Sequence, residues 1–162
     1  MKKLADTVAN ILMVLMAILL VVVVALAAVQ VVTRYFIAVQ ITWIEEVSIY
    51  FVTWMAAFGV PWMWLRGGHI KMDVLSFVLP EKILHILDYL SNIVGVAASV
   101  AVIRIGIRAI QVNSGYVLSV IKMDEGLRYY PVLCGGILFL FATVTVLTQM
   151  ILEDRKGGEH DR

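Results

Sequence analysis

The feature of this sequence that most limits its fold is a long run, residues 7–33, that contains no charged side chain. As an α-helix this run is about 40 Å long, which exceeds the ~30 Å hydrocarbon thickness of a bilayer. It is also longer than the apolar part of a secretory signal peptide, and no small-residue cleavage pattern follows it. We therefore predict a retained transmembrane helix near the amino end.

Three further apolar segments follow this first run. Residues 47–65 and residues 129–152 contain no charged side chain and are long enough to cross a bilayer. Residues 89–103 form a shorter uncharged run, about 22 Å as a helix, so this span requires its flanking charges to reach toward the headgroups. The predicted fold class is therefore all-α, an integral membrane protein with four transmembrane helices at about residues 8–33, 46–65, 86–110 and 129–152.

The segment between the second and third spans has a different pattern. Gly67 and Gly68 interrupt the second helix, and the apolar residues that follow alternate with polar ones at roughly helical spacing. This pattern predicts a short interfacial helix at about residues 69–79. Residues 153–162 form a polar tail, and we expect its end, residues 157–162, to be disordered. Residues 1–162 as a whole are predicted to form a single membrane domain.

Composition and charge exclude several classes of function. Hydrophobic residues make up 62% and charged residues 15% of the 162 residues, whereas soluble domains average near half and near a quarter. The net charge of +1 and the absence of a basic patch exclude nucleic-acid binding. A single cysteine, Cys134, excludes a disulfide framework and a thiolate metal cluster. No nucleophile, zinc-protease or phosphate-loop motif is present, so we predict a protein that is not an enzyme and has no cofactor of its own.

The distribution of basic residues predicts the orientation in the membrane. Eight of the 13 lysines and arginines lie at the amino end, in the second connection or in the tail, and five lie on the other side. By the positive-inside rule, this bias places both termini in the cytoplasm. The first group is Lys2, Lys3, Arg66, Lys71, Lys82, Arg155, Lys156 and Arg162, and the second is Arg34, Arg104, Arg108, Lys122 and Arg128.

Glu45 and Glu46 precede the second span and are the most prominent acidic residues of the chain. Ionisable residues near the bilayer often mark an ion or proton pathway. However, neighbouring residues on a helix point about 100° apart, so two adjacent carboxylates do not readily share a proton. Their place at the amino end of a helix also favours simple stabilisation by the helix dipole, which is the interpretation we prefer.

Two stripes of polar or small residues follow helical spacing. Helices in a bilayer associate through close packing and hydrogen bonds, so such stripes predict helix interfaces. We expect the stripe of the second span to meet either the third span or another subunit. The stripe of the second span consists of Glu46, Tyr50, Thr53 and Ala57, and that of the third consists of Ser91, Gly95 and Ser99.

Arg104 and Arg108 lie one turn apart near the predicted non-cytoplasmic end of the third span. Arginines in this position bind an anionic substrate, lipid phosphates or the carboxylates of a partner, and lipid headgroups are the preferred interpretation. The three histidines, His69, His85 and His160, fall outside the spans, which argues against a haem held in the membrane.

Residues 34–73 resemble the small permease, or Q, subunit of tripartite ATP-independent periplasmic (TRAP) transporters. That family typically shows an Arg-Tyr pair ending the first span, a Trp-x-Glu-Glu motif, an aromatic second span with a Trp and a Gly, and Arg-Gly-x-His-Ile followed by an acidic residue. A Tyr-Pro step, here Tyr130–Pro131, opens the last span. The matching residues here are Arg34, Tyr35, Trp43, Glu45, Glu46, Trp54, Gly59, Arg66, Gly67, His69, Ile70 and Asp73.

The resemblance implies a subunit of a bacterial or archaeal cytoplasmic membrane that binds a large permease, which carries the sodium and substrate sites, with a periplasmic substrate-binding protein as third component. Transport is then driven by an ion gradient without ATP, and the cargo is an organic anion such as a dicarboxylate or a sugar acid. The small subunit resembles a scaffold. Two other interpretations stay open: a small proton-coupled carrier that uses Glu45 or Glu46, and the membrane anchor of a redox enzyme.

Overall fold

The computed structural model describes residues 2–39, 41–67, 81–116 and 124–160. Four of its helices are long and apolar enough to cross a membrane, which confirms the predicted all-α class. The predicted interfacial helix at residues 69–79 lies outside the described residues. The elements are α1 (Lys2–Phe36), α2 (Thr42–Gly67), α4 (Glu81–Asn113), the short 3-10 helix η1 (Glu125–Tyr129) and α5 (Tyr130–His160).

Each long helix extends beyond the apolar run that predicts it. Charged and polar residues continue the backbone hydrogen bonding past the apolar core of the helix, as they do where α4 begins at Glu81. Residues 157–162 were expected to be disordered, and this is wrong for residues 157–160, because α5 continues to His160. Glu153, Arg155 and Lys156 are strong helix formers, so they extend a helix that has already been nucleated.

A tight reversal joins α1 to α2. The carbonyl oxygen of Thr33 accepts hydrogen bonds from the backbone N–H groups of Ile37 and Val39, both at 3.2 Å. Between these two donors, Ala38 has a φ of 56°, in the left-handed region that favours glycine. The chain therefore ends α1 with a strained alanine.

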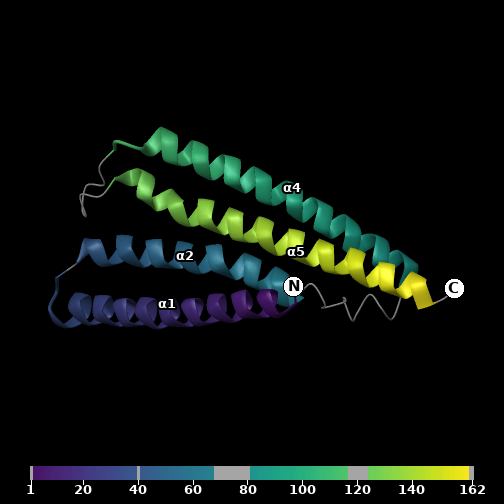
Figure 1. Cartoon of the computed structure of the whole chain (residues 1–162). Helices are drawn as coiled ribbons and strands as arrows, with labels where there is room; N and C mark the ends of the chain where they lie inside the picture. Colours follow the sequence, from purple (N-terminus) through teal and green to yellow (C-terminus); the bar gives the residue numbers. More distant parts are fainter. Residues whose placement is uncertain (1, 40, 68–80, 117–123, 161–162) are drawn as a thin grey trace.

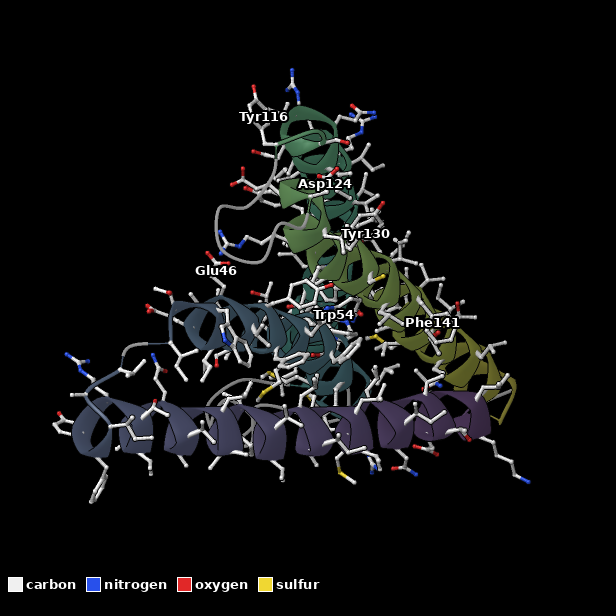
Figure 2. All side chains as sticks on the ribbon, turned by 90° about the vertical axis from the view of Figure 1, so that its left-hand side faces the viewer. Glu46, Trp54, Tyr116, Asp124, Tyr130 and Phe141 are labelled. Atoms are coloured by element: carbon white, nitrogen blue, oxygen red, sulfur yellow. The ribbon has the colours of Figure 1, made fainter. Side chains whose placement is uncertain are left out.

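The four long helices lie side by side in a row, in the order α1, α2, α5, α4 (Figure 1). Extensive contacts join α1 to α2, α2 to α5, and α5 to α4, whereas α1 touches α5 only slightly. Because α4 lies beyond α5, the row does not follow chain order. The row consists of the pair α1/α2 and the pair α4/α5, which separate toward the end that holds the α1–α2 reversal, and Figure 2 shows α5 inclined to α1.

A row of helices has little interior. Even in α5, the most enclosed span, only 33% of the residues in the apolar window are buried, and in α1 and α2 only 6% are. The outward faces are strongly apolar, with Val21 at 68% and Met63 at 65% exposure. Such faces require lipid or another protein to cover them. The buried apolar residues are Ala5, Ala9, Leu12, Ile44, Ala142 and Val146.

Candidate functional site at the helix contacts

The closest approach between the two helix pairs joins Gly135 of α5 to Ala57 of α2. A Cβ atom on Gly135 would lie 2.9 Å from the Cβ of Ala57 and 3.0 Å from its Cα and carbonyl oxygen. That carbonyl lacks its usual helical donor, because residue 61 is proline and has no N–H. Helix α2 nevertheless continues through Pro61, with the freed carbonyl packed against the glycine of α5.

The next residue, Gly136, makes a similar contact on the other side of α5. A Cβ atom there would lie 2.9 Å from Cγ1 of Ile103 and 3.1 Å from Cγ1 of Val102, both on α4. Consecutive helical residues point about 100° apart, so the Gly135–Gly136 pair lets α5 approach α2 and α4 at one level. We did not predict this pair from the sequence, although two small residues inside an apolar span are a recognised signal of helix packing.

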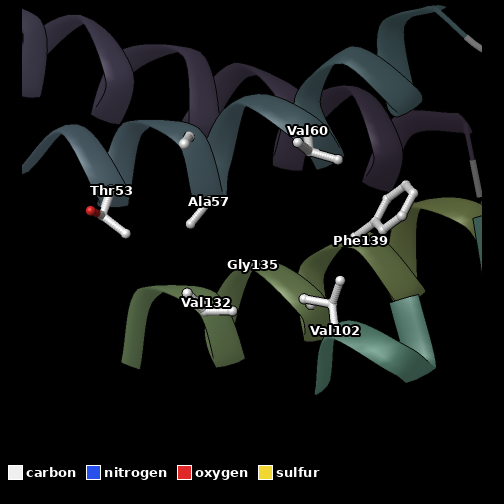
Figure 3. A pocket seen from close by; sticks show the side chains of 9 residues that line it. Thr53, Ala57, Val60, Val102, Val132, Gly135 and Phe139 are labelled. Atoms are coloured by element: carbon white, nitrogen blue, oxygen red, sulfur yellow. The ribbon is translucent and has the colours of Figure 1, made fainter. Parts of the chain in front are cut away.

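A groove of about 240 Å³ lies beside this contact, between α2, α4 and α5 (Figure 3). Its one hydroxyl, on Thr53, donates a 2.8 Å hydrogen bond to the carbonyl of Ile49. The groove therefore suits apolar groups and offers no charged ligand. Its lining residues are Thr53, Ala56, Ala57, Val60, Val102, Val132, Gly135, Gly136 and Phe139.

The stripe predicted on the second span thus packs partly within this chain. It was expected to meet the third span or another subunit, but Ala57 contacts α5, the fourth span. The reason is topological, because α5 lies between α2 and α4 in the row. Further along the stripe, the Tyr50 ring stacks edge-on against Trp54 at a centroid distance of 6.2 Å.

Glu45 and Glu46 have different surroundings at the start of α2. Glu45 is exposed, whereas Glu46 is half-buried, and its Oε2 is enclosed without a hydrogen-bond partner. Figure 2 shows Glu46 on the side of α2 that faces the opening between the two helix pairs. A carboxylate in the first turns of a helix is favoured by the helix dipole.

A polar cluster ties α2, α4 and α5 together at the opposite end of the row. The indole N–H of Trp64 donates to Oδ1 of the buried Asn92 at 3.1 Å. The Asn92 amide donates in turn to the carbonyl of Asp88 at 2.9 Å and to the sulfur of Met150 at 3.3 Å. Every polar group of the Asn92 side chain is therefore used, and Trp64 bridges from α2 to α4.

The small-residue stripe predicted on the third span lies partly in this contact. A Cβ atom on Gly95 would be 2.9 Å from Trp64 and from Thr143, and Ser99 is fully buried. Ser91, by contrast, is exposed. Two of the three stripe residues therefore face a neighbouring helix.

The remaining predicted residues are scattered along α1 and α2. The Arg66 guanidinium donates to the side-chain oxygen of Asn10, which joins α2 to α1. A Cβ atom on Gly59 would meet only the sulfur of Met16, at 3.7 Å, so packing does not require glycine there. Arg34 and Trp43 are exposed, Trp54 is half-buried and Gly67 ends α2, while His69 and Asp73 lie outside the described residues.

The connection between α4 and α5 is held by a side chain that the sequence analysis did not single out. Asp124 accepts hydrogen bonds from the backbone N–H of Gly126 at 2.8 Å and of Gly115 at 3.3 Å. Gly115 has a φ of 96°, which glycine adopts without strain. These bonds join the end of α4 to the start of η1.

These features define a protein with four helices long and apolar enough to cross a membrane, packed in a single layer with exposed apolar faces. Among the described residues there is no group of three His, Cys, Asp or Glu side chains that could hold a metal ion. The profile of the family described as "Tripartite ATP-independent periplasmic transporters, DctQ component" matches residues 23–153.

The chain belongs to this family and is a small membrane subunit of a TRAP transporter, not an enzyme. The family forms part of tripartite systems that also contain a large permease and a substrate-binding protein. A search of curated proteins finds no match to this chain.

Proposed function

We propose that this subunit is the scaffold of the large permease in the uptake of an organic anion, such as a carboxylate or a sugar acid, driven by an ion gradient. In this proposal, the coupling sodium ions and the substrate bind to the large permease, and a periplasmic binding protein delivers the substrate. Both termini of the small subunit lie in the cytoplasm of a bacterial or archaeal cell.

The observation that supports this role is the single-layer arrangement of the helices. A carrier surrounds its cargo with helices, whereas here each helix contacts its neighbours along a row and leaves two wide faces open. The charged residues of α1, α2 and α5 lie at the helix ends, which removes them from the region where a carrier binds its ion. The open apolar faces are suited to a larger membrane partner.

One observation favours a second candidate, a proton-coupled carrier that works alone. The unpartnered Oε2 of Glu46 is the type of group that binds a proton in such carriers. In this alternative, removal of the Glu46 charge abolishes transport, whereas in the scaffold role Glu46 contributes to assembly only.

Reconstitution into liposomes distinguishes the two roles. We expect uptake of an organic anion only when this subunit, the large permease and the binding protein are all present. We also expect Glu46→Gln to retain ion coupling, with Glu45→Gln as the matched exposed control. Ion-driven transport by this subunit alone, lost in Glu46→Gln and retained in Glu45→Gln, would overturn the scaffold proposal in favour of the carrier.

A further inference from the structure

The contacts between α4 and α5 show at which level along the row of helices Arg104 lies. Gly106 of α4 packs on α5, where a Cβ atom would lie 3.2 Å from the Cα of Leu133. A second contact lies just under one helical turn away, where Gly136 of α5 packs in the same way on Ile103 of α4. Arg104 lies between these two contacts and is therefore level with residues 133–136 of α5.

The same level on α2 is close to the middle of the span. Gly135 contacts Ala57, and Ala57 lies 11 residues after Glu46 and nine residues before Arg66. At ~1.5 Å per residue, these separations are about 16 Å and about 14 Å along the helix. On α5 the same level, residues 133–136, lies five to eight residues after Arg128, roughly 8–12 Å along the helix. A hydrocarbon layer of ~30 Å fits between the two charged ends of α2, so Arg104 lies inside that layer on the side that holds Arg128.

The direction of α4 makes it difficult for the guanidinium to leave this layer. In an α-helix the Cα–Cβ bonds tilt toward the amino end, and α4 begins at the far side of the layer from Arg104. The Cα–Cβ bond of Arg104 therefore points toward the middle of the membrane and away from the nearer boundary. Arginine at such depth is costly unless it is paired or hydrated.

The described part of this chain contains no partner for either arginine. Arg104 and Arg108 are both exposed, and neither has a hydrogen bond or an ion pair with the described residues. Helix α4 is at the edge of the row and packs against α5 with its other side. None of the described residues therefore serves as an acceptor for the two guanidinium groups.

The two arginines end an exposed apolar face of α4. Residue 86 and residue 104 are five helical turns apart, and Ile86, Leu90 and Ile93 share the face of Arg104 with exposures of 66%, 54% and 58%. Ile86, Leu90 and Ile93 also line a shallow groove on α4. A long apolar stripe that ends in two cations is complementary to a transmembrane helix with a carboxylate at that depth.

We propose that this face of α4 docks a transmembrane helix of the large permease and that Arg104, supported by Arg108, pairs with a carboxylate of that helix. The inference rests on the proposed scaffold function and specifies the face that carries it. A lipid phosphate is the competing acceptor, and it predicts the opposite effect of removing the charge. If Arg104 faces lipid, an apolar replacement removes the free-energy cost of a charge in the bilayer. If Arg104 faces a carboxylate of the permease, the same replacement leaves that buried anion unpaired.

The test is co-purification of the tagged large permease with Arg104→Leu, Arg104→Lys and the neighbouring control Ile105→Leu. We expect Arg104→Leu to lower the recovery of the permease at least tenfold, Arg104→Lys to retain part of it and Ile105→Leu to match the original subunit. We also expect a benzophenone side chain in place of Ile93 to crosslink to the permease under ultraviolet light.

The thermal unfolding of the isolated subunit in micelles separates docking from folding. Arg104 has no contact within the described chain, so Arg104→Leu should unfold at the same temperature as the original subunit. Equal recovery of the permease with Arg104→Leu would overturn the inference in favour of lipid contact, and a lower unfolding temperature would overturn it in favour of a role in folding. Failure of the original subunit to recover any permease would instead overturn the proposed function itself.

Discussion

Replacing Gly135 with alanine tests whether the contact between α2 and α5 holds the two helix pairs together. The new Cβ atom would lie 2.9 Å from the Cβ of Ala57 and 3.0 Å from its Cα and carbonyl oxygen. Carbon atoms in favourable contact are about 3.5–4.0 Å apart, so the helices must separate by roughly 0.5–1 Å. Overpacking of this kind costs about 1–3 kcal/mol.

The matched control is Gly59→Ala on α2. There a new Cβ atom meets only the sulfur of Met16, at 3.7 Å, which is an ordinary contact. Both substitutions gain similar helix propensity, up to about 1 kcal/mol, so this gain cancels when the two variants are compared. We therefore expect Gly135→Ala to be less stable than Gly59→Ala by about 1–3 kcal/mol in free energy of unfolding.

The assay is reversible unfolding of the purified subunit in mixed micelles, followed by the fluorescence of its 4 tryptophans. A second substitution, Ala57→Gly, removes one of the clashing atoms and should restore part of the stability lost in Gly135→Ala. Equal stability of Gly135→Ala and Gly59→Ala would show that α5 does not approach α2 this closely and would refute the prediction.

Two further substitutions test the ends of the row. Ala38→Gly relieves a left-handed alanine with a φ of 56°, and should raise the free energy of unfolding by about 1 kcal/mol in the same micelle assay. An unchanged or lower stability would contradict the strained reversal. Asn92→Leu removes the acceptor of the half-buried Trp64 indole N–H, and the loss of this hydrogen bond should cost about 1–3 kcal/mol. The tryptophan emission should also shift, and Ser91→Leu at an exposed position nearby should change neither property.

The helices of this chain were predictable because hydrocarbon thickness sets a length that any membrane-spanning helix must meet. Each uncharged run predicts its own helix independently of the helices that pack beside it, and all four predicted spans are present as helices. The ordered motif between Arg34 and Asp73 likewise indicated the family that the matching profile identifies. The interfacial helix at residues 69–79 stays a prediction.

The contacts between helices depended on tertiary structure. A stripe such as that of Thr53 and Ala57 predicts an interface but cannot name the partner, because several helices present small or apolar faces. Only packing decides that α5 lies between α2 and α4, through Gly135 on one side and Gly136 on the other. The unpaired oxygen of Glu46 is a similar case, since burial of one atom depends on all its neighbours.

Helix number and approximate extent were thus determined by the sequence alone, since they follow from local runs of apolar residues in a solvent of fixed thickness. The depth of Arg104 was decided by the tertiary structure, because it depends on how far α4 slides along α5. The contacts of Gly106 with Leu133 and of Gly136 with Ile103 set that register. Non-local packing therefore places Arg104 level with the contact between α4 and α5, and the run of residues around it does not reveal that level.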